Sequence, residues 1–235
     1  MSEWKQKRFW TAVSVVEAEQ GFAVELDGRR VKTPAKAALT VPTRAMAMAI
    51  AEEWEAQKEA VKPQTMPCTR SANAAIDKVR VQHAEVSDML AAYGDADLLC
   101  YRAENPQELV ARQCARWDPA LDWAESALGV RLELRQGILH RPQNAVVLQK
   151  LTSHVHALDA FQLAAFHDLV SMSGSLILGF AAAKGWRDVG EIWTLSRLDE
   201  LWQEEQWGPD DEAQAEAEVK RLAFLHAKRF YDLSR

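Results

Sequence analysis

The sequence has few cysteines and no long apolar run, and we expect no leader. Its three cysteines are Cys68, Cys100 and Cys114, an odd number without C-x-x-C or disulfide-framework spacing. We therefore predict reduced, mostly buried thiols rather than a disulfide scaffold. The longest apolar run, residues 176–183, is far too short to span a bilayer, so no membrane insertion is expected. The first residues lack the apolar core of a secretory signal, and Glu3 argues against a transit peptide.

The motifs of common catalytic and cofactor sites are also missing. There is no G-x-x-x-x-G-K-[ST] phosphate loop and no G-x-G-x-x-G dinucleotide motif. His154 and His156 stand two apart, which on a helix points them to opposite sides and disfavours a shared metal. The pair 167–168 (His-Asp) lies near Ser173 and Ser175, but no G-x-S-x-G elbow accompanies it. We predict no catalytic residue, no metal and no cofactor, and hence no enzyme.

Acidic residues outnumber basic ones, 34 to 28. The formal net charge is −6, which argues against a nucleic-acid partner. Residues 188–218 hold eleven acidic side chains and one basic side chain, Arg197, whereas residues 1–62 are nearly balanced. Such an acidic segment either steers a basic partner or forms a solvated helix surface that keeps the protein soluble. The charge pattern alone leaves both interpretations open.

The first 42 residues favour β-structure. Alternating apolar residues follow Gly21, and Asp27-Gly28 is a strong two-residue hairpin signal. Thr43 is a good N-cap for a helix over residues 44–60, whose apolar stripe can cover one face of a small sheet. We therefore predict a β-rich N-terminal domain over residues 1–62.

The pattern after Pro67 is helical, which predicts a larger all-helical domain over residues 63–235 and an α+β fold. Asn105-Pro106 and Asp118-Pro119 each have the form of a helix start, and Gly129 has the form of a helix end. Residues 130–134 alternate as an extended segment. Further helices are expected over residues 143–157, 160–171, 175–184, 189–207 and 211–233, with the apolar segment 176–181 at the centre.

The segment 189–207 gives the candidate binding residues. On one continuous helix, leucines and Trp202 share the flank that packs on the core. The opposite flank carries Trp193, Arg197, Glu200 and Glu204. A large aromatic ringed by charges suggests a surface that a partner covers, so these four are the predicted partner-binding residues. The alternative is a singly exposed tryptophan on a solvated face.

Several uncommon short sequence motifs, which we call words, occur in a fixed order along nearly the whole chain. This series resembles the Atp12 family of assembly chaperones for the F1 sector of ATP synthase. The words are residues 32–36 (KTPAK), 53–57 (EWEAQ), 66–73 (MPCTRSAN), 75–77 (AID), 97–102 (DLLCYR), 117–119 (WDP) and 199–203 (DELWQ). One departure is Cys68, where the family more often has leucine.

The resemblance implies a β-rich domain joined to a helical domain. It also implies a non-enzymatic chaperone that binds the unassembled F1 α subunit until the β subunit replaces it, and it points to Glu200. Family members act in the mitochondrial matrix or in bacteria, and we expect this one to be bacterial, cytoplasmic and monomeric. The alternative is a small-molecule enzyme with a cleft at the domain junction.

Overall fold

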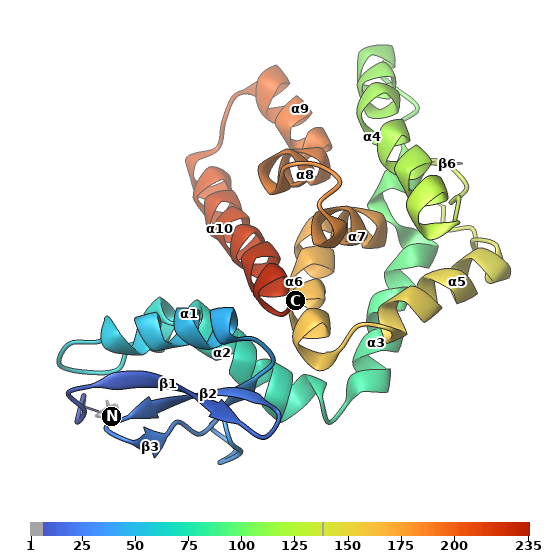
Figure 1. Cartoon of the computed structure of the whole chain (residues 1–235). Coiled ribbons are helices and arrows are strands. Elements are labelled where there is room, and N and C mark those ends of the chain that lie inside the picture. The colour runs from blue at the N-terminus through green and yellow to red at the C-terminus, as the bar shows by residue number, and fades with distance from the viewer. Residues whose placement is uncertain (1–6, 138) are drawn as a thin grey trace. The chain divides into compact units, whose positions relative to one another are not determined.

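The computed structural model describes residues 7–137 and 139–235, which belong to two compact units (Figure 1). Unit 1 holds the chain up to residue 83 together with residues 160–164 and 229–235, and unit 2 holds residues 84–159 and 165–228. The expected division between residues 62 and 63 therefore falls inside unit 1. The reason is that the helix after Pro67 packs on the helix before it, within the same unit.

Unit 1 contains a four-stranded antiparallel sheet. Val13 lies opposite Leu26 and Ala18 opposite Gly21 in the pairing of its two long strands, and two short strands pair with the second of them. Asp27 and Gly28 have φ of 48° and 75°, as a type I′ turn requires, so the predicted hairpin is confirmed. The strands are β1 (Val13–Ala18), β2 (Gly21–Leu26), β3 (Arg29–Arg30) and β4 (Thr40–Val41).

Helix α1 (Arg44–Glu55) is the covering helix expected from the sequence. The Thr43 side chain accepts a hydrogen bond from the Met46 amide at 3.1 Å, which caps the first turn. Met46 and Ile50 are fully buried, and α1 packs against β1 and β2. Figure 1 shows α1 lying over the sheet. A sheet of four short strands gains its apolar core from this helix.

The chain continues through short helical segments that acidic side chains tie to earlier parts of the chain. The Glu53 carboxylate accepts hydrogen bonds from the amides of Cys68 and Thr69, at 2.6 and 2.8 Å, where a helix begins. The Asp77 carboxylate accepts from the Thr33 hydroxyl at 2.6 Å. The segments are the 3₁₀ turn η1 (Pro63–Thr65), α2 (Pro67–Ala74), the π-helical η2 (Ala75–Val79) and α3 (His83–Ala91).

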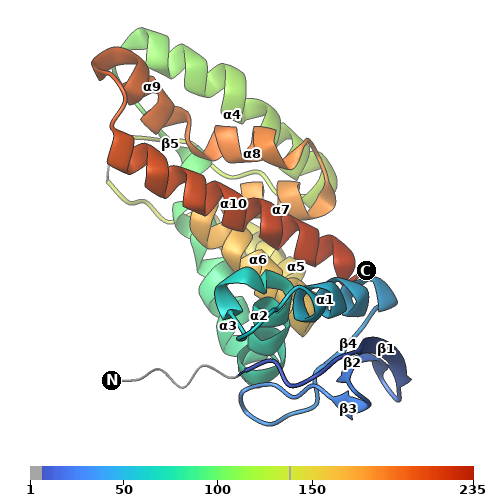
Figure 2. The same ribbon diagram turned by 90° about the vertical axis from the view of Figure 1, so that its left-hand side faces the viewer.

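Unit 2 is mainly helical and is built around α7 (Leu176–Lys184), whose residues 176–183 are all buried. Helix α7 contacts α8 and α4, and Figure 2 shows it just below α8. Among the described residues, no helix combines the length and apolar character needed to cross a membrane. Two further helices, α6 (Ala160–Ser173) and α10 (Asp211–Leu233), lie mostly in unit 2 and contribute one end each to unit 1. The other elements are η3 (Ala92–Ala96), η4 (Leu98–Cys100), β5 (Tyr101–Arg102), α4 (Gln107–Leu128), β6 (Arg135–Gln136), α5 (Ala145–His156), α8 (Val189–Ser196) and α9 (Leu198–Trp207).

Helix α4 corrects two expected helix starts. Asn105 is not the N-cap, because the residue at that position is Pro106, which makes no side-chain cap. Asp118-Pro119 lies inside α4 and starts no second helix. Trp117 and its buried neighbours on α4 pack in the core, and this packing outweighs the amide hydrogen bond that a proline removes. The predicted end at Gly129 is confirmed, with φ of 67°.

Candidate partner-binding site

The segment that carries the predicted partner-binding residues is two helices rather than one. Helix α8 ends at Ser196 and α9 begins at Leu198, and Arg197 between them has φ of −107° and ψ of 17°. A helical wheel drawn through the whole segment therefore loses its phase at Arg197. Residues before and after this break do not share the faces that a continuous helix would give them.

Trp193 shows the effect most clearly. Its side chain is only 7% exposed and packs against Phe224 of α10, with ring centroids 5.5 Å apart. The expectation that Trp193 lies on an exposed flank is therefore wrong. Helix α10 comes after the loop at Gly208-Pro209 and folds back over α8. The periodicity of residues 189–207 therefore carries no information about that contact.

Arg197 and Glu204 form an ion pair at 3.2 Å, and both side chains are largely buried. The second carboxylate oxygen of Glu204 accepts from the Gln214 side chain of α10 at 3.5 Å. This arrangement joins the first and last turns of α9 to each other and to α10. Glu204 and Arg197 thus have a structural role, and any contact with a partner would have to compete with it.

A different face of α9 is fixed to α4. The Gln113 side chain donates to Asp199 at 2.8 Å, and Arg112 binds the Glu205 carboxylate through both terminal guanidinium nitrogens. The Arg112 guanidinium also lies 4.6 Å from the centroid of the Trp202 ring. The bond from Arg112 lowers the pKa of the Glu205 carboxyl from its usual value. These contacts set the rotation of α9 about its axis.

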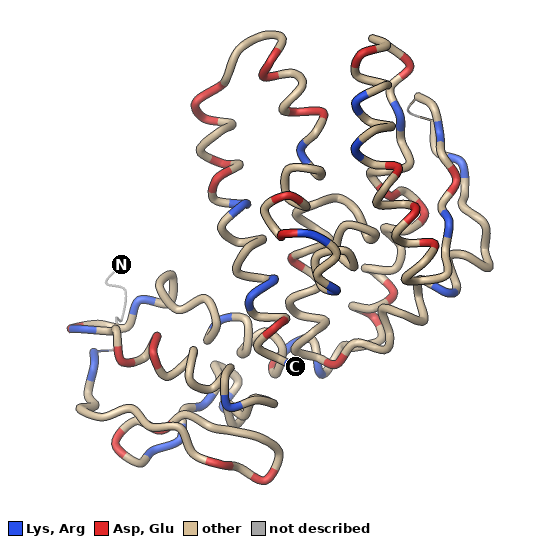
Figure 3. Tube along the Cα trace, turned by 45° about the horizontal axis from the view of Figure 1, so that its top comes forward, with Lys and Arg blue, Asp and Glu red and all other residues tan. Residues whose placement is uncertain are grey.

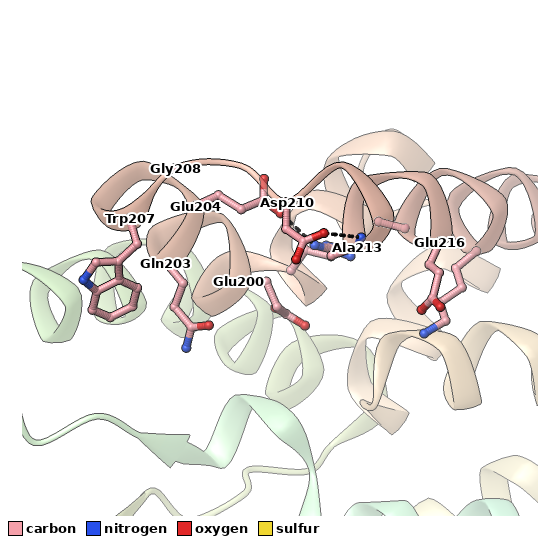
Figure 4. A pocket seen from close by; sticks show the side chains of 11 residues that line it. Glu200, Gln203, Glu204, Trp207, Gly208, Asp210, Ala213 and Glu216 are labelled. Atoms are coloured by element: carbon pink, nitrogen blue, oxygen red, sulfur yellow. Dashed lines mark hydrogen bonds and ion pairs between the residues drawn. The ribbon is translucent and has the colours of Figure 1, made fainter.

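With two faces occupied, α9 presents a third. Glu200, Gln203 and Trp207 stand at i, i+3 and i+7 and line a groove of about 340 Å³ between α9 and α10 (Figure 4). We call this the acidic groove; it is lined by Arg197, Glu200, Gln203, Glu204, Trp207, Gly208, Asp210, Ala213, Glu216, Ala217 and Lys220. In Figure 4, Trp207 marks one end, Glu216 the other, and Glu200 lies between them.

Several side chains in the acidic groove are exposed and available to a partner, among them Glu200 and Trp207. Trp207 is 79% exposed, and Glu200 is exposed and makes no hydrogen bond or ion pair with any residue that the structure describes. Gln203, Trp207 and Glu216 were not among the predicted site residues. The sequence does indicate Gln203 and Trp207, because they follow Glu200 at helical spacing. Glu216 comes from α10, which only folding brings to the groove.

The surroundings of the acidic groove are strongly acidic. Figure 3 shows acidic residues along α9 and the first half of α10, in agreement with the excess counted over residues 188–218. Val219 and Leu222 of α10 are also exposed, at 68% and 55%. Acidic side chains beside exposed apolar ones match a partner surface that is basic and partly apolar.

The other residues considered for a catalytic or metal site have structural roles. Ser175 caps α7 by accepting from the Leu178 amide, and Ser173 donates to the Leu169 carbonyl at 2.7 Å. His167 contacts Asp168 beside it in the sequence, at 3.0 Å. No group of three or more potential metal ligands occurs within residues 7–137 and 139–235. The three cysteines are free, and burial raises the pKa of the Cys68 thiol to about 12.

Comparison with known proteins decides the family. Residues 7–125 match the family model described as ATP12 chaperone protein. The chain belongs to the ATP12 chaperone family. It is 29% identical over 221 residues to the protein named Protein atp12, mitochondrial, of Schizosaccharomyces pombe, covering 88% of this chain and 75% of the relative.

Solved structures of bacterial ATP12 proteins have the same fold. The crystal structure of Atp12 from Paracoccus denitrificans superposes with a TM-score of 0.96 at 48% identity, covering 99% of this chain and all of that one. A mutant of P. denitrificans Atp12p gives a TM-score of 0.97 at 48% identity, with both chains fully covered. The present protein is therefore a bacterial-type ATP12 protein, with the α+β architecture expected from its sequence.

Proposed function

We propose that this protein is an assembly chaperone for the F1 sector of ATP synthase. It binds the unassembled F1 α subunit and shields the surface that faces other subunits until the β subunit replaces it. The acidic groove is part of the contact, with Glu200 as its central charge. We place the protein in the bacterial cytoplasm as a monomer, whereas the S. pombe relative is named as mitochondrial.

The observation that carries this proposal is the free state of Glu200 and Trp207, among the described residues, in a chain of the ATP12 chaperone family. An exposed tryptophan beside an unpaired carboxylate offers a partner both apolar area and a charge-assisted hydrogen bond. Trp and Arg dominate the energetics of many protein interfaces, so an arginine of the client between Glu200 and Trp207 is the chemistry that this groove fits best.

The decisive experiment is charge reversal at Glu200. Because Glu200 has no partner among the described residues, Glu200→Lys should change the free energy of unfolding by no more than about 0.5 kcal/mol. A reversed charge at the contact should cost on the order of 2 kcal/mol of binding, or roughly thirtyfold in affinity. We expect the variant to fold normally and to fail to prevent aggregation of isolated α subunit, both measured on one preparation.

A matched control is Glu212→Lys. Glu212 is exposed in the same acidic segment but does not line the acidic groove. The two variants have the same net charge, so protection by Glu212→Lys together with failure of Glu200→Lys assigns the effect to the groove. Full protection by Glu200→Lys would remove Glu200 from the contact, and a large drop in its melting temperature would make it a structural residue.

The alternative of a small-molecule enzyme has its own test. Relatives of this chain are named as chaperones, and the sequence carries no phosphate loop. We therefore expect isothermal titration of ATP or ADP into the protein to give no saturable heat. Saturation at micromolar nucleotide would contradict this expectation and favour the enzyme.

A further inference from the structure

A second groove lies on the other side of α9, entirely within unit 2. It has a volume of about 460 Å³ and is walled by α4 on one side and by α8 and α9 on the other. We call it the arginine groove; its lining residues are Arg112, Arg116, Arg187, Glu191, Thr194, Leu195, Leu198, Leu201 and Glu205. Nothing derived above for the acidic groove uses these side chains, except that Arg112 and Glu205 hold α9 to α4.

Two of the three arginines in this groove have no ion-pair partner in the part of the chain that the structure describes. Arg112 is occupied by the Glu205 carboxylate, at 2.8 Å. Arg116 and Arg187 form no hydrogen bond or ion pair with any residue in the described ranges, and Arg116 is exposed. Glu191 is the other acidic residue of the lining, so three arginines face two glutamates and the groove is positive in a protein of net charge −6.

The guanidinium group of Arg187 is held in place by aromatic stacking. It lies 4.3 Å from the centroid of the Trp186 ring, which in turn packs on Trp123 of α4 at 5.8 Å. Arg112 is stacked on Trp202 in a similar way. The donors of Arg112 are taken by Glu205, but stacking leaves the N–H edge of the Arg187 guanidinium free, and a stacked guanidinium loses less side-chain entropy when it binds a carboxylate.

The floor between the arginines is apolar. Leu195 and Leu198 are buried, and Leu201 is partly exposed at the groove. A carboxylate alone would leave Leu201 uncovered, and an aliphatic side chain alone would leave the two arginines unpaired. The lining therefore selects a ligand that places a carboxylate next to an aliphatic group, and the volume has room for a few side chains.

We propose that the arginine groove is a second docking site, which binds an acidic and aliphatic peptide segment, with glutamate or aspartate next to leucine-like side chains, of a protein partner. This inference deepens the proposed function, because α9 is a wall of both grooves and one client can reach both. Segments of opposite charge then bind on opposite sides of α9, which fixes the orientation of the client.

The test uses peptide probes and no α subunit, so the Glu and Gln probes report on the arginine groove independently of the proposed function. The first probe is a short, fluorescein-labelled helical peptide with Glu and Leu on one face. The second has Gln at every Glu position, and the third has Lys there. We expect the Glu probe to bind the full-length protein about tenfold more tightly than the Gln probe, measured by fluorescence anisotropy.

Variants then locate the binding. Arg116→Gln/Arg187→Gln should weaken the Glu probe about tenfold. Arg116→Lys/Arg187→Lys keeps the charge but loses the planar fork, so it should weaken binding by less. The matched control Arg44→Gln/Lys184→Gln removes the same charge from exposed residues outside both grooves and should bind like wild type. The Lys probe should be insensitive to the Arg116/Arg187 variants and weakened by Glu200→Lys.

Several results would overturn the arginine groove as a peptide site. These are equal affinity for the Glu and Gln probes, no binding of either probe, or unchanged binding of the Glu probe by Arg116→Gln/Arg187→Gln. Tighter binding of a single-stranded oligonucleotide than of the Glu probe at the same arginines would likewise overturn it. Thermal unfolding of each variant confirms that the compared proteins are folded.

Discussion

Glu200 and Glu204 lie one helical turn apart on α9, yet they differ in how free their carboxylates are to bind a partner. Glu204 is held by Arg197 and Gln214, whereas Glu200 has no partner among the described residues. The sequence spacing also permits an Arg197–Glu200 contact, but the structure pairs Arg197 with Glu204. Position on a polar helix face therefore does not say whether a charge is available to a partner.

Asp97 is the most unusual charged residue in unit 2. It is fully buried, and its carboxylate accepts from the Ser175 hydroxyl at 2.8 Å and from the Leu99 and Ile177 amides at 3.0 Å. Burial raises the pKa of the Asp97 carboxyl to about 6, although these hydrogen bonds oppose the rise. Because Ser175 and Ile177 lie at the start of α7, Asp97 is bound to the first turn of the buried helix of this unit.

We predict a pH-dependent stability from Asp97. A carboxyl pKa that is higher in the folded state contributes stability that is fully present below the unfolded pKa. This contribution is lost as the pH rises through about 6. The free energy of unfolding of wild type, relative to the non-titrating Asp97→Asn, should therefore fall between about pH 4 and pH 7, by on the order of 2 to 3 kcal/mol. Urea unfolding of both proteins across this range measures it, and a constant difference would contradict the prediction.

At the scale of elements, the words that carry the family resemblance pair with one another in space. Residues 53–57 supply Glu53, which caps α2 within residues 66–73. Residues 75–77 supply Asp77, which holds the loop of residues 32–36. In unit 2, Arg102 binds Asp118 at 2.8 Å. These words encode contacts between elements, which explains why they look unlike ordinary helix or strand patterns.

Glu53 offers the sharpest test of such a contact. Its carboxylate accepts three hydrogen bonds at the start of α2, where Met66 provides no side-chain cap. Glu53→Gln replaces one accepting oxygen by a donor, so it should lower the free energy of unfolding by about 1 to 3 kcal/mol. The neighbouring Glu52→Gln, at an exposed position, should change it by less than about 0.5 kcal/mol. Equal thermal unfolding of the two variants would show that the cap contributes little.

At the scale of the whole molecule, unit 1 is assembled from distant parts of the chain. Residues 160–164 and 229–235 belong to it, and the Thr43 hydroxyl donates to the Leu233 carbonyl near the other end of the sequence. The expected domain of residues 1–62 is therefore only part of a compact unit. A small sheet with one helix is a marginal core, and these later residues help to complete it.

A protein that starts at Pro63 tests this arrangement. It would lose the sheet and α1, and it would expose the buried face that α2 packs on α1, including Cys68 and Ala72. We expect it to be poorly soluble or unable to protect α subunit from aggregation, compared with the full chain at equal concentration. A soluble truncated protein with full protection would show that residues 1–62 are dispensable.

The sequence by itself determined the features that depend on neighbouring residues. The Asp27-Gly28 turn, the Thr43 cap, the end at Gly129 and the buried segment 176–183 follow from local backbone preference and apolar pattern. The words of the family resemblance, in their fixed order, likewise indicate the ATP12 family from the amino acids alone. The local signals lie within one element or at its end, where interactions between sequence neighbours are strongest.

Tertiary structure decided what distant residues do to one another. It broke the helix at Arg197, buried Trp193 under Phe224 and kept α4 continuous through Pro119. It also decided which acidic side chains remain free, because Glu204 is held by Arg197 and by Gln214 of α10, and Glu205 by Arg112 of α4. These outcomes depend on contacts between residues far apart in sequence, whose free energy exceeds the small local preferences from which a helix is predicted.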